Sequence, residues 1–175
     1  MTATHSGLVV AVEDFDDPDG RALVAELIAD LDERYAADDD PDADNPELTG
    51  DWAVRPEQVR PPAGGFVVAR IDGAPVGCGA VRRLPFGPPE VAEIKRMYTR
   101  PSARRRGVSR AILTALEHHA AGLGYRRVQL VTGLRQPEAM ALYEGAGYRP
   151  VEPFGPFAAS EIVRCYAKDL AVPPG

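Results

Sequence analysis

Apolar and polar residues follow two periods along this chain, and these periods predict its elements. Residues 7–13 (GLVVAVE) are typical of a strand, and 19–36 carry apolar side chains at the spacing of an amphipathic helix. Two further apolar runs, 66–71 and 74–84, flank Asp72-Gly73, a pair that favours a tight hairpin turn. Strands are also predicted over 90–99, 126–133, 148–151 and 161–170, and helices over 108–123 and 136–147.

The order of these elements predicts an α/β domain. The segments 90–99, 108–123 and 126–133 run strand, helix, strand, which requires a crossover and hence at least some parallel pairing. The 175 residues suit one domain, so a single domain is expected over 1–175. No run of about 18 or more apolar residues occurs, so we expect no membrane span.

Two segments fall outside this pattern. Residues 38–47 (DDDPDADNPE) are acidic and broken by proline, within a loop-rich insertion predicted over 38–62. Either a surface loop or a mobile cover over a substrate site fits this composition. Residues 171–175 are predicted to form a flexible tail.

The net charge of −6 conceals two unlike parts. Residues 1–51 hold 16 acidic and 2 basic residues, a balance of −14, whereas residues 52–175 are at +8. Nine of the 20 Lys and Arg residues lie between Arg82 and Arg110. A cluster confined to so short a segment indicates a site for one compact anion. It argues against a general nucleic-acid-binding surface.

The numbers and positions of cysteine and histidine indicate what to expect of disulfides, cellular location and metal binding. Two cysteines, Cys78 and Cys165, are too few for a disulfide framework, and the N-terminus lacks the basic start of a signal peptide. We therefore expect reduced thiols and a cytoplasmic protein. The three histidines show no spacing typical of a zinc site, so no metal is expected.

A basic turn leads from the strand 90–99 into the long helix. It reads Arg104-Arg105-Arg106-Gly107-Val108-Ser109. The first turn of a helix has free N–H groups and a positive dipole end, which favour phosphate binding. Glycine at 107 would let a phosphate approach the backbone closely. A solvated basic helix cap is the alternative interpretation.

Several motifs resemble those of one family. R-x-x-G-x-S at 104–109 resembles motif A (Q/R-x-x-G-x-G/A) of the GNAT acetyltransferase superfamily, and QPEAMALYEGAGYRPV at 136–151 resembles its motif B. EIKRMYTR and CYAKDL are similar to the family's central and last strands. The chain is identified as a small stand-alone bacterial member. This implies a mixed, mostly antiparallel sheet of about six or seven strands with a splayed parallel pair, flanked by about four helices.

The resemblance implies acetyl-coenzyme A as co-substrate, with its thioester entering between strands 90–99 and 126–133. Ser109 stands where Gly or Ala is usual, and Gln136 where Asn often contacts the cofactor. The residues assigned to the cofactor are Met97, Tyr98, Thr99, Arg104, Arg105, Arg106, Gly107, Val108, Ser109, Arg110 and Gln136.

Two residues are candidates for proton transfer. Glu93, on the central strand beside the gap, would take a proton from the acceptor amine, directly or through water. The alternative is a surface or ion-paired carboxylate, with Lys95 or Arg96 as its partner. Tyr143 resembles the motif B tyrosine that donates a proton to the leaving thiolate, and a packing tyrosine is the alternative.

The expected acceptor is a small-molecule amine. Tyr35, Arg82, Arg96 and Phe154, together with Trp52 and Phe157, are the candidates that would line its site. A carboxylated amine would suit an arginine, whereas a polycationic amine would suit the acidic segment. A non-catalytic acyl-CoA sensor and a protein or peptide N-acetyltransferase are the alternative functions. A homodimer is a further expectation, because members of this family are often dimers.

Overall fold

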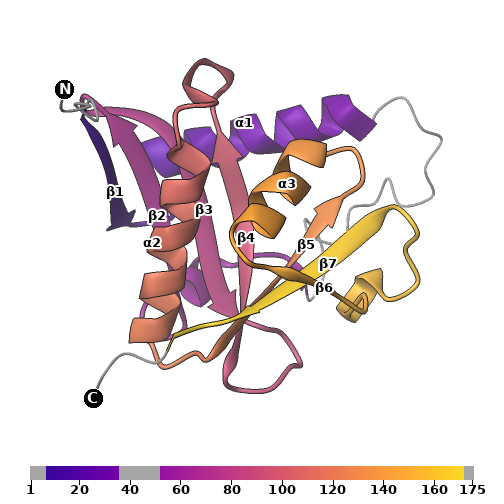
Figure 1. Cartoon of the computed structure of the whole chain (residues 1–175). Coiled ribbons are helices and arrows are strands. Elements are labelled where there is room, and N and C mark those ends of the chain that lie inside the picture. The colour runs from indigo at the N-terminus through magenta and orange to yellow at the C-terminus, as the bar shows by residue number, and fades with distance from the viewer. Residues whose placement is uncertain (1–6, 36–51, 172–175) are drawn as a thin grey trace, which may run out of the picture.

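Seven strands form one sheet in the computed structural model, which describes residues 7–35 and 52–171. The strands are β1 (Leu8–Glu13), β2 (Gly64–Ile71), β3 (Ala74–Arg83), β4 (Val91–Thr99), β5 (Arg127–Gly133), β6 (Arg149–Val151) and β7 (Val163–Asp169). Their spatial order is β1-β2-β3-β4-β5-β7-β6 (Figure 1). Only the β4–β5 pair is parallel among these strands. The predicted mixed, mostly antiparallel sheet is confirmed.

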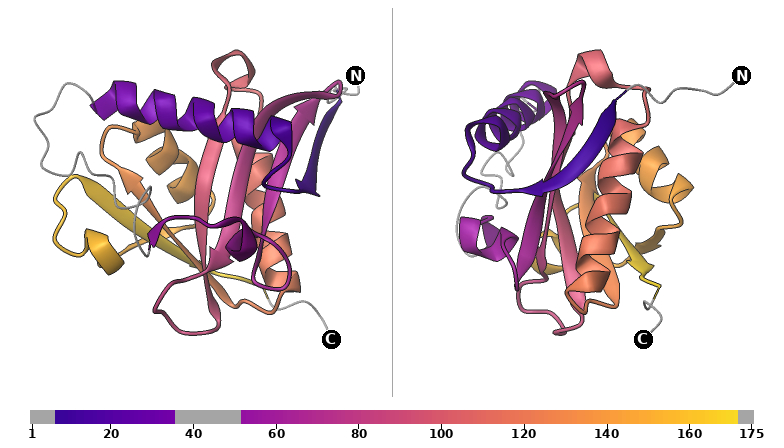
Figure 2. Two further views of the ribbon diagram at one scale, coloured as in Figure 1. Left: turned by 180° about the vertical axis from the view of Figure 1, so that it is seen from behind. Right: turned by 90° about the vertical axis from the view of Figure 1, so that its left-hand side faces the viewer.

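Helices cover both faces of the sheet. The helix α1 (Pro18–Tyr35) lies on one face, and α2 (Val108–Gly122) and α3 (Pro137–Gly145) lie on the other (Figure 2, right). The described residues therefore hold three α-helices, against about four expected. Within the predicted insertion, residues 56–59 form only the short 3-10 helix η3, because prolines at 56, 61 and 62 interrupt longer helical hydrogen bonding.

The apolar stripe of each helix decides which face it covers. Leu23 and Leu27 of α1 are buried against Phe66, Val68 and Ala80 of the sheet. On the opposite face, Ile112 and Leu116 of α2 pack closely onto β3. A Cβ added to Gly79 would lie 2.8 Å from Ile112 Cγ2 and from Leu116 Cδ1, so glycine is what lets the helix approach this strand.

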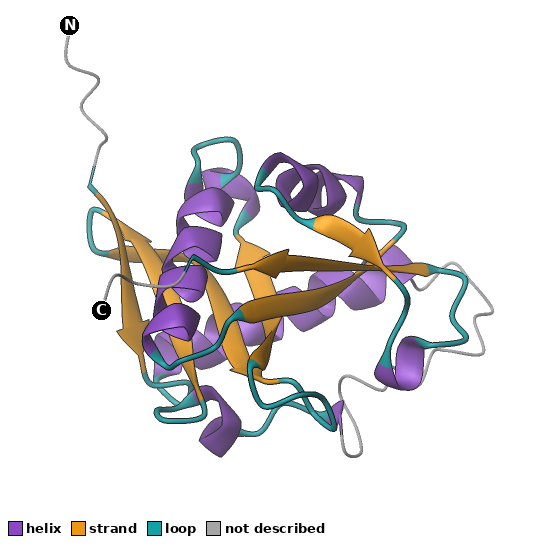
Figure 3. Ribbon diagram, turned by 60° about the horizontal axis from the view of Figure 1, so that its bottom comes forward, coloured by secondary structure: helices purple, strands orange, loops and turns teal. Residues whose placement is uncertain are grey.

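β4 and β5 separate along their length. They pair only at Val91–Arg127, Ala92–Val128 and Glu93–Gln129, although both strands continue further. Beyond these pairs, β4 remains hydrogen-bonded to β3 on its other side, and β5 remains hydrogen-bonded to β7. The strong twist of the sheet carries β5 and β7 away from β4 (Figures 1 and 3). The predicted splayed pair is therefore present.

A bulge bends β4 at the start of this gap. Lys95 pairs with Ala80 and Tyr98 with Cys78, so two residues of β4, Arg96 and Met97, oppose one residue of β3. Arg96 has a φ of 57°, in the left-handed region. A bulge re-aims the groups that follow it, and here those groups line the gap.

Candidate active site

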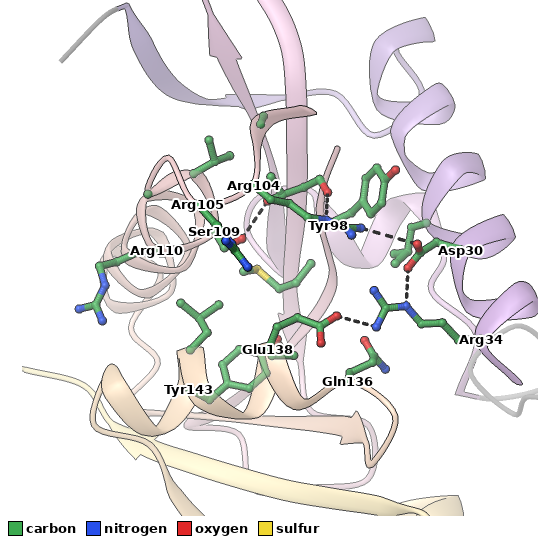
Figure 4. A pocket seen from close by; sticks show the side chains of 18 residues that line it. Asp30, Arg34, Tyr98, Arg104, Arg105, Ser109, Arg110, Gln136, Glu138 and Tyr143 are labelled. Atoms are coloured by element: carbon green, nitrogen blue, oxygen red, sulfur yellow. Dashed lines mark hydrogen bonds and ion pairs between the residues drawn. The ribbon is translucent and has the colours of Figure 1, made fainter. Parts of the chain in front are cut away.

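A pocket of about 680 Å³ lies at the splayed end of β4. Its walls come from α1, from the end of β4, from the turn into α2 and from α3 (Figure 4). All the residues that the sequence assigned to the cofactor line it except Arg106, which is exposed and not among the lining residues. Tyr143 lines it as well. The structure thus brings together motifs that lie some forty residues apart.

The basic turn opens onto the pocket. Arg105 and Gly107 have φ values of 62° and 77°, and Gly107 is the N-cap of α2 with no side-chain cap. The N–H groups of the first helical turn therefore remain available to a ligand. A Cβ added to Gly107 would meet nothing within 4 Å, so the space before the turn is open. This cradle fits a phosphate group.

Ser109, which stands where the family motif usually has Gly or Ala, is hydrogen-bonded to β4. Its Oγ lies 2.9 Å from Oγ1 of Thr99, and Arg104 Nε donates to the Thr99 carbonyl oxygen at 3.2 Å. The hydroxyl therefore has a partner in the pocket wall, and the two bonds hold the turn against the end of the strand.

Tyr143 lies on the wall that α3 contributes. Its side chain is buried, and its ring packs against Tyr148 and Tyr166 at centroid distances of 5.7 and 6.2 Å. Tyr148 is different, because its hydroxyl donates to Glu117 at 2.9 Å and it lines no part of the pocket. Burial, followed by the charge of Glu117, raises the pKa of Tyr148. Of the two, only Tyr143 is placed to meet a ligand there.

Glu93 is not brought into this pocket. It is the last residue of β4 that pairs with β5, beside the gap, but its side chain is fully buried and does not line the pocket. Arg82 Nε donates to one carboxylate oxygen at 3.0 Å, and Trp52 Nε1 and Lys95 Nζ lie 3.3 and 3.4 Å from the other. This arrangement favours the ion-paired interpretation, and the base role stays a prediction.

Arg82 takes a structural position. It is 1% exposed, and besides Glu93 it donates to the carbonyl oxygens of Trp52 and Ala53 and to the Gln58 side chain. It therefore anchors the segment 52–58 onto the sheet. Arg82 does not line the pocket described here, and its donors have partners within the protein, so its assignment to the acceptor site stays a prediction.

Four other acceptor candidates lie outside the lining of this pocket. Phe154 and Phe157 gather around Trp52 with ring centroids 6.4 Å from it, and Arg96 is nearly buried at the bulge. None of these four lines the described pocket. The side chain of Tyr35, at the end of α1, lies outside the part that the structure describes.

Three charged residues of the pocket were missed from the sequence. Asp30 and Arg34 of α1 and Glu138 of α3 form one end of it (Figure 4). The i,i+4 spacing of Asp30 and Arg34 was visible as an ion pair on one helix face. That this face meets Glu138 across the gap depends on packing between distant segments.

Comparison with known proteins agrees with this geometry. The model of the acetyltransferase (GNAT) family matches residues 25–148. The IAA acetyltransferase of Azospirillum brasilense is 36% identical over 147 residues, which cover 84% of this chain and 90% of that protein. The chain belongs to the GNAT acetyltransferase family.

Solved structures of GNAT proteins share the fold. A Klebsiella pneumoniae protein classed as an acyl-CoA N-acyltransferase superposes with a TM-score of 0.72 at 25% identity, covering 94% of this chain and 98% of that one. A GNAT-family acetyltransferase from Staphylococcus aureus gives 0.67 at 16% identity, covering 94% and 100%. The predicted family and the predicted class of enzyme, an acyltransferase, are confirmed.

Metal-ligand groups and membrane-spanning helices are both absent from the part of the chain that the structure describes. Across residues 7–35 and 52–171, no three His, Cys, Asp or Glu side chains form a group that could hold a metal ion. In the same ranges, no helix has both the length and the apolar character needed to cross a membrane.

Proposed function

We propose that this GNAT enzyme transfers an acetyl group from acetyl-coenzyme A to the primary amine of a small molecule, by direct attack in a ternary complex. One observation carries the proposal. A single pocket connects the phosphate cradle at Gly107, the bulged end of β4 and Tyr143. A long ligand could place a phosphate group in the cradle at Gly107 and a reactive carbonyl between the end of β4 and Tyr143.

Acetyl-coenzyme A supplies an acetyl group activated as a thioester, and the residues of the chain would bind and orient it. The first-turn N–H groups of α2 would hold the pyrophosphate, with Arg104, Arg105 and Arg110 adding charge. We also keep Arg106 as a proposed contact to the cofactor, from the exposed surface beside the pocket. Backbone groups of Met97, Tyr98 and Thr99 would pair with the pantetheine arm, and one N–H there would polarise the thioester carbonyl.

Proton movements complete the reaction. The acceptor ammonium loses a proton before its nitrogen attacks, with Glu93, acting through water, as the proposed base. The new C–N bond forms as the C–S bond breaks, and the nitrogen loses its second proton to solvent as the amide forms. Tyr143 gives its proton to the departing sulfur and is reprotonated from solvent. One proton is released for each amide formed.

A small-molecule acceptor has two supports. The Azospirillum relative is named for acetylation of IAA, a small molecule. The pocket end under α1 is lined by the charged side chains of Asp30, Arg34 and Glu138, which suits a compact polar ligand.

The test is an acceptor screen. The purified protein is incubated with acetyl-coenzyme A and a panel of amines, amino acids and peptides, and mass spectrometry detects a gain of one acetyl group together with thiol release. Acetylation of small amines supports the proposal. Tight binding of acetyl-coenzyme A without turnover would indicate an acyl-CoA sensor, and acetylation of peptides alone would indicate a protein-modifying enzyme.

A further inference from the structure

Charges of both signs meet at the end of the pocket under α1. Arg34 Nε donates to Asp30 at 2.9 Å, and Arg34 Nη1 contacts Glu138 of α3. Arg34 Nη1 also donates to the carbonyl oxygen of Arg135 at 3.3 Å, and Arg104 Nη2 lies 3.6 Å from Asp30. This end of the pocket is therefore an alternating row of carboxylates and guanidinium groups drawn from α1, α3 and the basic turn.

These charges remain open to a ligand. The side chains of Asp30 and Arg34 are 28% and 24% exposed, whereas Glu93 and Arg82 are almost completely enclosed. Within the described part of the chain, Arg34 uses Nε and Nη1 for its contacts. Nη2 is directed toward the pocket (Figure 4).

From this arrangement we infer that the acceptor is an amine that also carries a carboxylate close to its nitrogen, such as an α-amino acid, with Asp30 and Arg34 holding its two charges. The inference rests on the proposed function and names the substrate class of that same pocket. The Asp30–Arg34 pair presents opposite charges about one hydrogen-bond length apart, 2.9 Å. The ammonium and carboxylate of an α-amino acid are separated by a single carbon. Such a ligand can lie against the pair head to tail and leave no charge unmatched.

The same charges disfavour other amines. An amine without a carboxylate would contact Asp30 but leave the guanidinium group of Arg34 facing no charge of the ligand. A polycationic amine would place a further positive charge beside that guanidinium group. Selectivity would thus arise as much from repulsion of the wrong ligand as from attraction of the right one. Of the two acceptors that the sequence left open, this arrangement favours the carboxylated amine over the polycationic one.

The experiment compares matched ligands. Each amino acid is paired with the amine that lacks its carboxylate, and isothermal titration calorimetry measures binding of both to the protein saturated with coenzyme A. We expect at least one pair in which the carboxylated member binds about tenfold tighter or more, since a charge-assisted bond is worth that much. Arg34→Gln should reduce this ratio to about one. Arg34→Lys should keep part of it, because the charge remains and the planar fork is lost.

Arg21→Gln is the control variant. Arg21 is on the same helix, 68% exposed and outside the pocket, so the ratio should stay at its original value. Thermal melting followed by circular dichroism checks that each variant is folded. Equal binding within every ligand pair, or a ratio that survives in folded Arg34→Gln protein, would overturn the inference.

The readouts separate this inference from the proposed function. Acetylated product is measured in parallel for both members of each ligand pair. Equal acetylation of both members would overturn the carboxylate inference and leave the acetyltransferase function standing. Absence of acetylated product from every amine would overturn the proposed function whatever the ligands bind.

Discussion

Arg82→Met removes the main cation from a buried ion pair. The side chains of Arg82 and Glu93 are 1% and 0% exposed, with a shortest nitrogen–oxygen distance of 3.0 Å. Removing one partner of such a pair typically costs about 3–5 kcal/mol, because the other charge is left in a medium of low polarity. Lys95 Nζ, 3.4 Å from Glu93, compensates in part, so we expect about 3 kcal/mol.

Urea denaturation followed by circular dichroism measures this loss. Arg83→Met is the matched control, because the neighbouring residue is exposed and its replacement should change the free energy of unfolding by less than about 0.5 kcal/mol. Glu93→Gln and the double variant complete a cycle. Removing both charges should cost about 1–3 kcal/mol less than the sum of the single changes. Additive costs within about 0.5 kcal/mol would refute a coupled pair.

The same Glu93→Gln protein tests the competing catalytic role. A base that titrates would make the activity ratio of wild type to variant change with pH and the loss greatest near neutrality. A ratio that is flat from acid to alkaline pH would leave Glu93 as the structural carboxylate that its contacts indicate.

Three further predictions follow from the pocket and the core. Tyr143→Phe should lower kcat about 100-fold with little change in the affinity for acetyl-coenzyme A. Tyr148→Phe is the control and should leave kcat unchanged, because the Tyr148 hydroxyl donates to Glu117 outside the pocket. An unchanged kcat in Tyr143→Phe would remove Tyr143 from the acid role. Gly107→Trp should weaken coenzyme A binding by about 100-fold or more in calorimetry, because the indole would fill the phosphate cradle. Gly124→Trp, at a residue that also has positive φ near the far end of α2, is its control, and equal affinities would contradict the cradle assignment. Burial raises the pKa of Cys78 to about 12, so the thiol stays protonated at pH 8 and should react with iodoacetamide only after unfolding, as peptide mass spectrometry would show.

Local pattern predicted the elements and part of the lining of the pocket. Hydrophobic spacing placed all seven strands and three helices within a few residues, because each period reports which face of an element is buried. The basic turn was equally visible, since the phosphate binding proposed for it depends on consecutive residues at one helix end. Tyr143, which lines the pocket, was singled out through the resemblance of its motif to that of the family.

Long-range contacts were not predictable in the same way. The sequence pointed to Lys95 or Arg96 as partners of Glu93, but the main partner is Arg82, which register places opposite Glu93 on β3. This pair lies between the β3–β4 connection and the bulge at Arg96, so its register is set at the connection, and only the assembled sheet shows it.

By itself, the sequence determined the family, the sheet with its crossover helix and the basic cradle, because these depend on local periodicity and short motifs. Only the tertiary structure decided which charged side chains contact one another. It enclosed Glu93 with Arg82, and it brought Asp30 and Arg34 of α1 against Glu138 of α3, residues that lie about a hundred positions apart. Whether a carboxylate is a structural partner or part of a ligand site depends on what surrounds it, and folding creates those surroundings.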